Sequence, residues 1–528
     1  MIDSTATTIP ALLDAAVQQH PDGLAISDGT TTLTFRDLGQ TASAAARAYL
    51  AAGVGPGDRV AIWAPNIWEW VPAAIGVHLA GAALVPLNTR YKGAEAAYIL
   101  GRGRAKVLVT MGEFLGTDYA QLLESTVDVP SDLPDLERIV TLRSDGARGW
   151  DAFVAQGSKI GEEAVRERAA AVTSSDLSDI LFTSGTTGNP KGVMQTHGAT
   201  TRAFRAWSDV VGLTAGDRYL VVNPFFHAFG YKAGWLACLM TGATVHPQAV
   251  FDVDDVMARI ARERISVMPG PPTLFQSILN HPGRDQHDLT SLRLVVTGAA
   301  AIPVELILRM RDELAIETII TGYGLTEACG IATMCRFDDD PETIALTSGR
   351  AIPDVEVLVV DDTGAEVPRG SPGEVVVRGY NVMRGYLDEA EETSATIDEA
   401  GWLHTGDVGV MNERGYLRIT DRTKDMFIVG GFNAYPAEIE NLMLRNDKIA
   451  QVAVVGVPDE RLGEVGMAFV VLRPGAEATP EELVAWARDE MANYKAPRYI
   501  ELVSELPLNA MGKVLKYDLR ERAAKLVR

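Results

Sequence analysis

Up to Ser348, short apolar runs alternate with longer segments in which apolar positions recur every three or four residues. Runs rich in β-branched residues predict strands, and the periodic segments predict amphipathic helices. The predicted strands are 60–63, 82–87, 107–109, 220–222, 294–296 and 318–320, and the predicted helices are 44–52 and 303–314. Because strands that alternate with helices usually pair in parallel, the pattern predicts an α/β chain with parallel sheets.

The pattern changes twice in the second half of the chain. Between Ser348 and Gly415, short strands at 355–360 and 373–378 are separated by glycine and proline turns, which indicates a small β-rich subdomain. Beyond residue 425 the alternation resumes, with a helix expected to begin at Pro436 and strands at 453–455 and 468–471. Because 528 residues exceed one ordinary core, we expect a large domain and a smaller α+β domain at the C-terminal end.

One weakly charged stretch, from Trp70 to Leu87, resembles a membrane span in composition. It contains two prolines, two glycines and a histidine, and many of its apolar residues are alanines. A buried helix followed by a strand explains this stretch better than a bilayer helix.

Charge and cysteine content narrow the class of protein. The net charge of −22 disfavours nucleic acid or an anionic membrane as the main partner. The three cysteines have neither disulfide nor metal-site spacing, and the N-terminus lacks the basic region of a signal peptide. We therefore expect a cytoplasmic protein that holds any phosphate-rich ligand through local donors.

The loop from Thr183 to Gly192 carries the strongest chemical signal. It follows the apolar run 180–182 and contains Ser184, Gly185, Thr186, Thr187, Gly188 and Lys191. Glycines bring backbone N–H groups close to an anion, while the hydroxyl groups and the lysine add further donors. The spacing is not that of the Walker A motif. A polyphosphate site is therefore favoured over a simple surface turn.

Further motifs follow the loop in a characteristic order. They are 223–230 (NPFFHAFG), 297–300 (TGAA), 321–327 (TGYGLTE), 401–407 (GWLHTGD), 419–422 (ITDR), Pro507 and 512–513 (GK). Together they resemble the adenylate-forming superfamily of acyl-CoA synthetases, peptide-synthetase adenylation domains and firefly-type luciferases. The resemblance covers essentially the whole chain. It implies two half-reactions, in which a carboxylate attacks the α-phosphate of ATP and a thiol then displaces AMP.

The resemblance assigns roles to residues of the ATP site. Lys191 and the loop would hold the β- and γ-phosphates, and Glu327, joined by Thr183, would bind Mg²⁺, which prefers oxygen ligands. Tyr323 would stack on adenine, and Asp407 would accept from the ribose hydroxyls with Arg422 nearby. The remaining nucleotide contacts would come from Gly298, Ala299, Ala300, Gly322, Gly324, Thr326 and Ile419.

The resemblance also implies moving parts. Residues 1–421 would form the N-terminal domain, 422–425 the hinge and 426–528 the mobile C-terminal domain, with Lys424 at the pivot. Lys513 would bridge the carboxylate and the α-phosphate during adenylation, and His227 would orient the acid. Gly430 and Gly431 would line the channel of the pantetheine arm in the second half-reaction.

The acid pocket is expected to be apolar. Its predicted lining comprises Phe225, Phe226, His227, Phe229, Tyr231, Trp235, Pro271 and Ile302. The surrounding motifs look closest to actinobacterial ligases of steroid-ring degradation, which activate a bicyclic propanoate. Coenzyme A is the expected acceptor, because the pocket lacks the aspartate that holds an amino group in peptide-synthetase domains.

Several alternatives remain open at the level of the sequence. In one alternative, the acid is a medium- or long-chain fatty acid or an aryl acid. In another, the acyl group is passed to a carrier protein in trans and not to CoA. A non-catalytic nucleotide sensor with the same fold is a different class of protein, and a homodimer is also compatible with the sequence.

Overall fold

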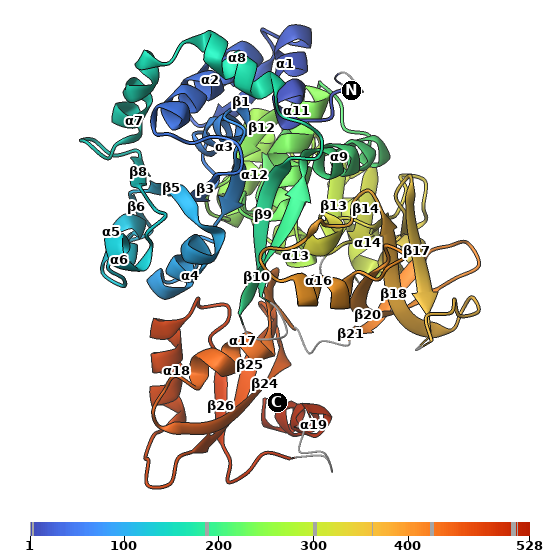
Figure 1. Ribbon diagram of the computed structural model, residues 1–528. Coiled ribbons are helices and arrows are strands. Elements are labelled where there is room, and N and C mark those ends of the chain that lie inside the picture. Colours follow the sequence, from blue (N-terminus) through green and yellow to red (C-terminus); the bar gives the residue numbers. More distant parts are fainter. Residues whose placement is uncertain are drawn as a thin grey trace.

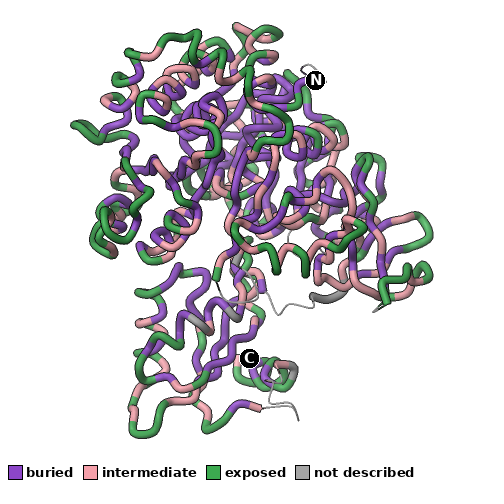
Figure 2. The backbone as a smooth tube through the Cα atoms, viewed as in Figure 1, coloured by how far each residue is buried: buried purple, intermediate pink, exposed green. Residues whose placement is uncertain are grey.

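The computed structural model describes residues 2, 5–184, 189–298, 302, 304–361, 363–422, 427–507, 514 and 516–527; for 184, 420–422, 437, 441 and 517 it describes the backbone alone. Two separate hydrophobic cores divide the chain. The first extends from Ile2 to Leu417, and the second from Phe427 to Ala523. Figure 1 shows the corresponding large and small domains, and Figure 2 shows buried backbone inside each. The exact hinge limits, 422–425, stay a prediction.

The first sheet of the large domain has seven strands in the order β19-β10-β9-β4-β3-β5-β8. The strands are β3 (Arg59–Trp63), β4 (Ala83–Pro86), β5 (Ala105–Met111), β8 (Arg138–Leu142), β9 (Leu177–Ser184), β10 (Pro190–Thr196) and β19 (Gly385–Tyr386). From β9 to β8 all neighbours are parallel, whereas β10 is antiparallel to both β9 and β19. The predicted parallel sheet is therefore confirmed, with an antiparallel edge at the phosphate loop.

A second sheet is assembled from two four-stranded parts, β11-β12-β1-β2 and β13-β14-β15-β16. These strands are β1 (Leu24–Asp28), β2 (Thr31–Thr34), β11 (Arg218–Val221), β12 (Thr244–Pro247), β13 (Leu294–Gly298), β14 (Thr318–Tyr323), β15 (Thr333–Met334) and β16 (Arg350–Ala351). Val267 joins the two parts through single bridges to Tyr219 and Leu294. A two-stranded hairpin, β6 (Glu113–Phe114) and β7 (Thr117–Asp118), lies outside both sheets.

Helices of the large domain cover these sheets (Figure 1). They are α1 (Ile9–Gln19), α2 (Phe35–Ala51), α3 (Trp70–Leu79), α4 (Gly93–Gly103), α5 (Tyr119–Glu124), α6 (Val129–Asp132), α7 (Trp150–Gln156), α8 (Glu162–Ala170), α9 (His197–Val211), α10 (Ala228–Gly230), α11 (Ala237–Thr241), α12 (Val253–Glu263), α13 (Pro272–Leu279), α14 (Val304–Leu314), α15 (Pro341–Leu346) and α16 (Ala390–Thr396). Short 3-10 turns are η1 (Gly157–Lys159), η3 (Arg284–Gln286) and η4 (Thr326–Ala328), and η2 (Tyr231–Leu236) is a π-helix.

The weakly charged stretch forms α3 and β4 inside the large core, as predicted. Every residue of α3 is buried, which explains its lack of a polar face. Across the described part of the chain, the structure contains no helix with the length and apolar character needed to span a bilayer.

The β-rich subdomain is an antiparallel sheet in the order β17-β18-β20-β21, as the change of pattern after Ser348 predicts. Its strands are β17 (Val355–Val360), β18 (Pro372–Gly379), β20 (Leu403–Met411) and β21 (Leu417–Arg422). This sheet places Asp407 on β20 beside Tyr323, the last residue of β14.

The small domain places a sheet against three helices. The strands are β22 (Phe427–Val429), β23 (Phe432–Ala434), β24 (Ile449–Asp459), β25 (Gly463–Leu472) and β26 (Tyr499–Leu502), and the helices are α17 (Pro436–Met443), α18 (Pro480–Glu490) and α19 (Lys516–Leu526). Pro436 is the first residue of α17, as predicted from its missing N–H donor.

Candidate functional site

The phosphate loop is the tip of a β-hairpin. The predicted strand before it is β9, and the chain returns antiparallel along β10, so that Thr183 and Lys191 are register partners. The metal-binding candidate Thr183 and the phosphate-binding candidate Lys191 therefore lie on neighbouring strands. Gly185, Thr186, Thr187 and Gly188 lie outside the described residues, and Ser184 is described in its backbone only.

Glu327 is held beside Lys191 by a tyrosine that the sequence analysis did not select. Tyr386 on β19 is buried, and its hydroxyl donates to Glu327 Oε1 at 2.9 Å. Its ring lies 5.2 Å from Lys191 Nζ, which also forms an ion pair with Glu392 on α16. Desolvation and the nearby Glu327 carboxylate raise the pKa of Tyr386, which keeps its hydroxyl protonated as a donor.

A second contact ties the hairpin to the segment that carries Glu327. Gln195 on β10 donates through Nε2 to the carbonyl oxygen of Thr326 at 3.1 Å. After β14 the chain folds back closely on itself. A Cβ atom at position 324 would lie only 2.3 Å from the carbonyl oxygen of Gly330, so glycine is needed there. The motif 321–327 therefore needs its second glycine for a close backbone approach.

The predicted adenosine contacts meet where β13 and β14 end beside β20. Gly298 and Gly322 are register partners in the parallel pair β13–β14. The hydroxyl of Tyr323 donates to Asp407 Oδ2 at 2.6 Å. Asp407 in turn is the register partner of Arg422 on β21, a strand that also carries Ile419. Ala299 and Ala300 lie outside the described residues, and Arg422 is described in its backbone only.

His227 has a defined protonation pattern. Its Nδ1 accepts a hydrogen bond from the backbone N–H of Phe229 at 3.2 Å at the start of α10. The ring reaches solvent, yet enough protein surrounds it that desolvation lowers the pKa of His227. In the neutral ring the proton is therefore on Nε2, which makes Nε2 a donor toward an acid substrate.

Three predicted pocket residues lie in the hydrophobic core. Phe225, Tyr231 and Trp235 are fully buried and pack their rings around Trp70 at centroid distances of 5.5, 6.2 and 6.0 Å. The three rings therefore pack together in the core beside the segment that carries His227, and their assignment to the acid pocket stays a prediction. Phe226, Phe229 and Pro271 are half-buried and remain candidates for the lining, as does the buried Ile302.

A buried ion pair that sequence reasoning missed links this segment to the hairpin. Lys232 on η2 lies 2.9 Å from Asp179 on β9, and both side chains are 0% exposed. Lys232 Nζ also donates to Thr200 Oγ1 at 3.3 Å, and Ser178 donates to the second oxygen of Asp179 at 2.6 Å. The sequence held one signal for this pair: Asp179 and Lys232 are single charged residues within apolar stretches, and a buried charge needs a partner.

The glycines of the predicted pantetheine channel lie beside the large domain. Gly430 and Gly431 have φ angles of +56° and +87°, a conformation that favours glycine. A Cβ atom at Gly431 would be 3.7 Å from Pro271, and the next residue, Phe432, stacks on Phe226 with ring centroids 6.5 Å apart. The predicted hinge residue Lys424 and the predicted adenylation residue Lys513 lie outside the described residues.

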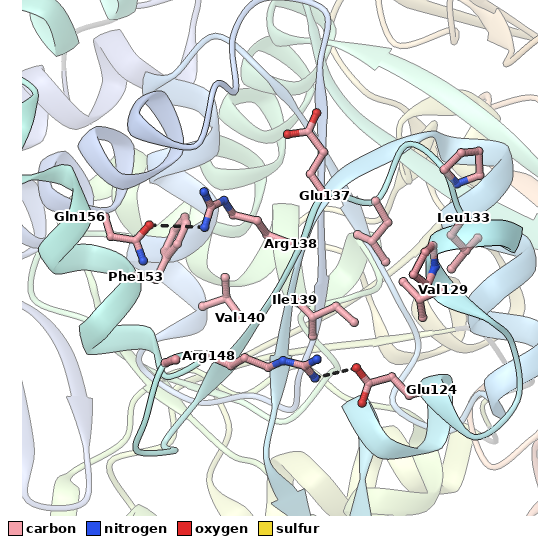
Figure 3. Close-up of a pocket in the computed structure, with 14 residues that line it drawn as sticks. Glu124, Val129, Leu133, Glu137, Arg138, Ile139, Val140, Arg148, Phe153 and Gln156 are labelled. Atoms are coloured by element: carbon pink, nitrogen blue, oxygen red, sulfur yellow. Dashed lines mark hydrogen bonds and ion pairs between the residues drawn. The ribbon is translucent and has the colours of Figure 1, made fainter.

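A surface cavity of about 590 Å³ lies away from these residues (Figure 3). It is bordered by α5, α6, β8 and α7, and Figure 3 shows two polar contacts across it, Arg148 with Glu124 at 2.6 Å and Arg138 with Gln156 at 3.4 Å. None of the predicted site residues is part of its lining. The cavity is therefore separate from the candidate active site.

Family models match both parts of the chain. The AMP-binding enzyme model matches residues 13–387, and the AMP-binding enzyme C-terminal domain model matches residues 438–513. The chain therefore belongs to the AMP-binding enzyme family, and both the predicted superfamily and the predicted fold class are confirmed.

Individual relatives resemble the chain over its full length. A 3-[(3aS,4S,7aS)-7a-methyl-1,5-dioxo-octahydro-1H-inden-4-yl]propanoyl:CoA ligase of Rhodococcus jostii is 50% identical, with 98% of each chain covered. The structure of o-succinylbenzoate CoA synthetase from Bacillus subtilis with a product analogue, OSB-NCoA, superimposes with a TM-score of 0.81 at 27% identity, covering 97% of this chain and 98% of that one. ATP-bound MatB from Rhodopseudomonas palustris superimposes with a TM-score of 0.69 at 27% identity, covering 99% of this chain and 100% of that one.

Proposed function

We propose that this chain is an AMP-forming acid–CoA ligase that converts an acid, ATP and CoA to acyl-CoA, AMP and pyrophosphate. The observation that carries the proposal is the contact of Tyr386 with both Glu327 and Lys191. It brings a carboxylate and an ammonium group to one end of a nucleotide site whose other end is the Tyr323–Asp407 pair. The full-length relative of 50% identity is itself an acid–CoA ligase.

In the first half-reaction a carboxylate oxygen of the acid attacks the α-phosphorus of ATP, and pyrophosphate leaves. The hairpin with Lys191 stabilises the leaving pyrophosphate by charge and by backbone donors. His227 donates from Nε2 to the acid and orients it for attack. Lys513 bridges the acid and the α-phosphate, and it arrives on the small domain by rotation about the hinge at Lys424.

Magnesium fits the donor set around Glu327. In the described ranges, no three His, Cys, Asp or Glu side chains come together as a metal site. A hard cation there needs phosphate oxygens beside the Glu327 carboxylate and the Thr183 hydroxyl, which is how Mg²⁺ is usually held with nucleotides. Held there, Mg²⁺ would neutralise charge on the phosphates.

In the second half-reaction the thiol of CoA attacks the acyl carbon of the adenylate and AMP leaves. The orientation of the small domain suits this step, because Gly431 lies beside Pro271 and Phe432 beside Phe226. At the same 27% identity, the chain is more similar to the complex with a CoA product analogue than to ATP-bound MatB, with TM-scores of 0.81 and 0.69. This difference supports a thioester-forming orientation.

The acid that we propose is a steroid-derived bicyclic propanoate. The Rhodococcus relative is named for such an acid. The rings of Phe226 and Phe229, which flank His227 in the sequence, and Pro271 are all half-buried and offer apolar surface that suits fused rings better than acetate. Medium-chain fatty acids and aryl acids are the comparison compounds.

The test is a substrate panel with purified protein, ATP, Mg²⁺ and CoA. Release of AMP and pyrophosphate that depends on the acid, with the bicyclic propanoate giving the highest kcat/KM, supports the proposal. Release of ADP and phosphate contradicts the reaction, whereas a better fatty or aryl acid contradicts only the substrate.

A lysine variant separates the two half-reactions. Lys513→Ala is expected to lower acid-dependent ATP–pyrophosphate exchange by at least about a hundredfold, because the transition-state charge loses its cation. Formation of acyl-CoA from pre-made acyl-adenylate is expected to survive. Unchanged exchange would remove Lys513 from the adenylation step and would favour a nucleotide sensor.

A further inference from the structure

A buried ion triad spans the boundary between the two domains. Lys495, in the segment between α18 and β26, lies with Nζ 2.6 Å from Glu95 Oε1 and 2.7 Å from Glu438 Oε1. Glu95 is on α4 of the large domain, and Glu438 is on α17 of the small domain. The three side chains are only 1%, 8% and 4% exposed, respectively. Here one ammonium group is thus shared between the two domains.

Aromatic rings surround the shared ammonium group. Lys495 Nζ lies 4.6 Å from the ring of Tyr91 in the large domain and 5.7 Å from that of Tyr494 in the small domain. The Asn88 amide is 3.5 Å from the Tyr494 hydroxyl, another contact across the boundary. Burial alone would lower the pKa of Lys495, but Glu438, Tyr494 and Glu95 raise it well above its ordinary range. Lys495 is therefore charged in this orientation.

The two carboxylates differ in what happens when the small domain rotates. Lys495 and Glu438 both belong to the small domain, so their pairing does not depend on how the domains are oriented. The bridge between Lys495 and Glu95 exists only while α4 and the small domain are in contact. In this orientation the Glu95 carboxylate is covered by the small domain, and without Lys495 it would be a buried charge with no partner, so the bridge is what makes the closed boundary favourable.

We propose that Glu95 is a positioning residue for the thioester-forming half-reaction, acting through Lys495 to hold the small domain in the orientation seen here. The inference rests on the two half-reactions proposed above. The same orientation places Gly431 against Pro271 and Phe432 against Phe226, which couples the bridge to the acid site. Glu95 itself touches neither nucleotide nor acid candidates among the described contacts, so it acts on domain position alone.

The decisive variant is Glu95→Gln. Glutamine keeps the acceptor that caps α4, where Glu95 Oε2 accepts from the backbone N–H of Lys92 at 2.9 Å, and removes only the charge. Acyl-CoA formation from pre-made acyl-adenylate is expected to slow about tenfold or more, because the buried pair is broken. Acid-dependent ATP–pyrophosphate exchange is expected to stay within about twofold, because it uses contacts distant from the bridge.

Glu389→Gln is the matched control. Glu389 pairs at 3.0 Å with Arg102, which lies on α4 as Glu95 does. This ion pair, however, lies wholly within the large domain. Its loss should leave both half-reactions unchanged. Glu95→Asp, which keeps the charge but shortens the side chain by one methylene group, is the second variant and should also slow only the thioester step.

The outcomes are distinguishable. An equal loss of both half-reactions in the two Glu95 variants, or no loss in either, overturns the positioning role. Absence of acid-dependent exchange in the unmodified protein would instead overturn the proposed function itself.

Discussion

The hydroxyl of Tyr323 donates to Asp407 Oδ2 at 2.6 Å and joins the end of β14 to β20 of the β-rich subdomain. These two residues are 84 positions apart in the sequence and come from the motifs 321–327 and 401–407. The contact holds two groups in fixed relative positions: the carboxylate that we assign to the ribose and the ring that we assign to adenine. Each residue therefore orients the other before ATP binds.

Tyr323→Phe keeps the ring and removes this donor. A hydrogen bond to a charged group contributes about 1.5–3 kcal/mol, so the KM for ATP in pyrophosphate exchange should rise about tenfold or more. Tyr416→Phe is the matched control, because Tyr416 donates to Asp339 at 2.6 Å in a similar pair that includes no predicted site residue. An unchanged KM in Tyr323→Phe would show that Asp407 needs no such support.

Tyr386→Phe tests how the metal candidate is held. Without the hydroxyl, Glu327 loses the donor that orients its Oε1, and the concentration of Mg²⁺ needed for half-maximal exchange should rise about tenfold or more. Tyr380→Phe removes an exposed tyrosine hydroxyl that donates to the carbonyl oxygen of Pro353 at 3.2 Å, and it should have no effect. A Mg²⁺ requirement that does not change would place the cation away from Glu327.

Breaking the buried pair of Lys232 and Asp179 should destabilise the large domain. Lys232→Met leaves Asp179 charged in the core and is expected to reduce the free energy of unfolding by about 3–5 kcal/mol. Arg202→Met, which breaks an exposed pair with Asp354, should cost less than about 1 kcal/mol. Urea denaturation of the two variants provides the measurement, and equal losses would contradict the importance of burial.

Acid should weaken the fold through His197. This side chain is buried, its Nδ1 accepts from the backbone N–H of Ile9 at 3.3 Å, and burial lowers its pKa to about 4. The unfolded chain binds a proton near its ordinary pKa of 6.5, so stability falls as the pH falls below 6.5 and stops falling near pH 4. From pH 7 to pH 5 this group should remove about 2 kcal/mol.

His197→Asn checks this assignment, because asparagine can still accept a hydrogen bond but does not titrate in this range. The decrease in unfolding free energy between pH 7 and pH 5 should be smaller by about 2 kcal/mol in the variant. A dependence that persists in full in His197→Asn would point to another group.

The sequence by itself determined the elements and the class. Apolar periodicity predicted strands such as 107–109 and the buried stretch 70–87 correctly, because the alternation of apolar and polar positions reflects local backbone geometry. The order of the motifs predicted the adenylate-forming family, because residue types such as the Thr183–Gly192 loop and Glu327 are tied to phosphate and cation chemistry.

Only the tertiary structure decided which side chains meet. Phe225, Tyr231 and Trp235 have the chemistry of pocket residues, and the structure shows that they pack around Trp70 in the core. Tyr386, Lys232 and Lys495 gave little signal because their partners, Glu327, Asp179 and Glu95, are distant in the sequence. Burial and pairing of charges depend on three-dimensional proximity, which a local pattern along the chain does not encode.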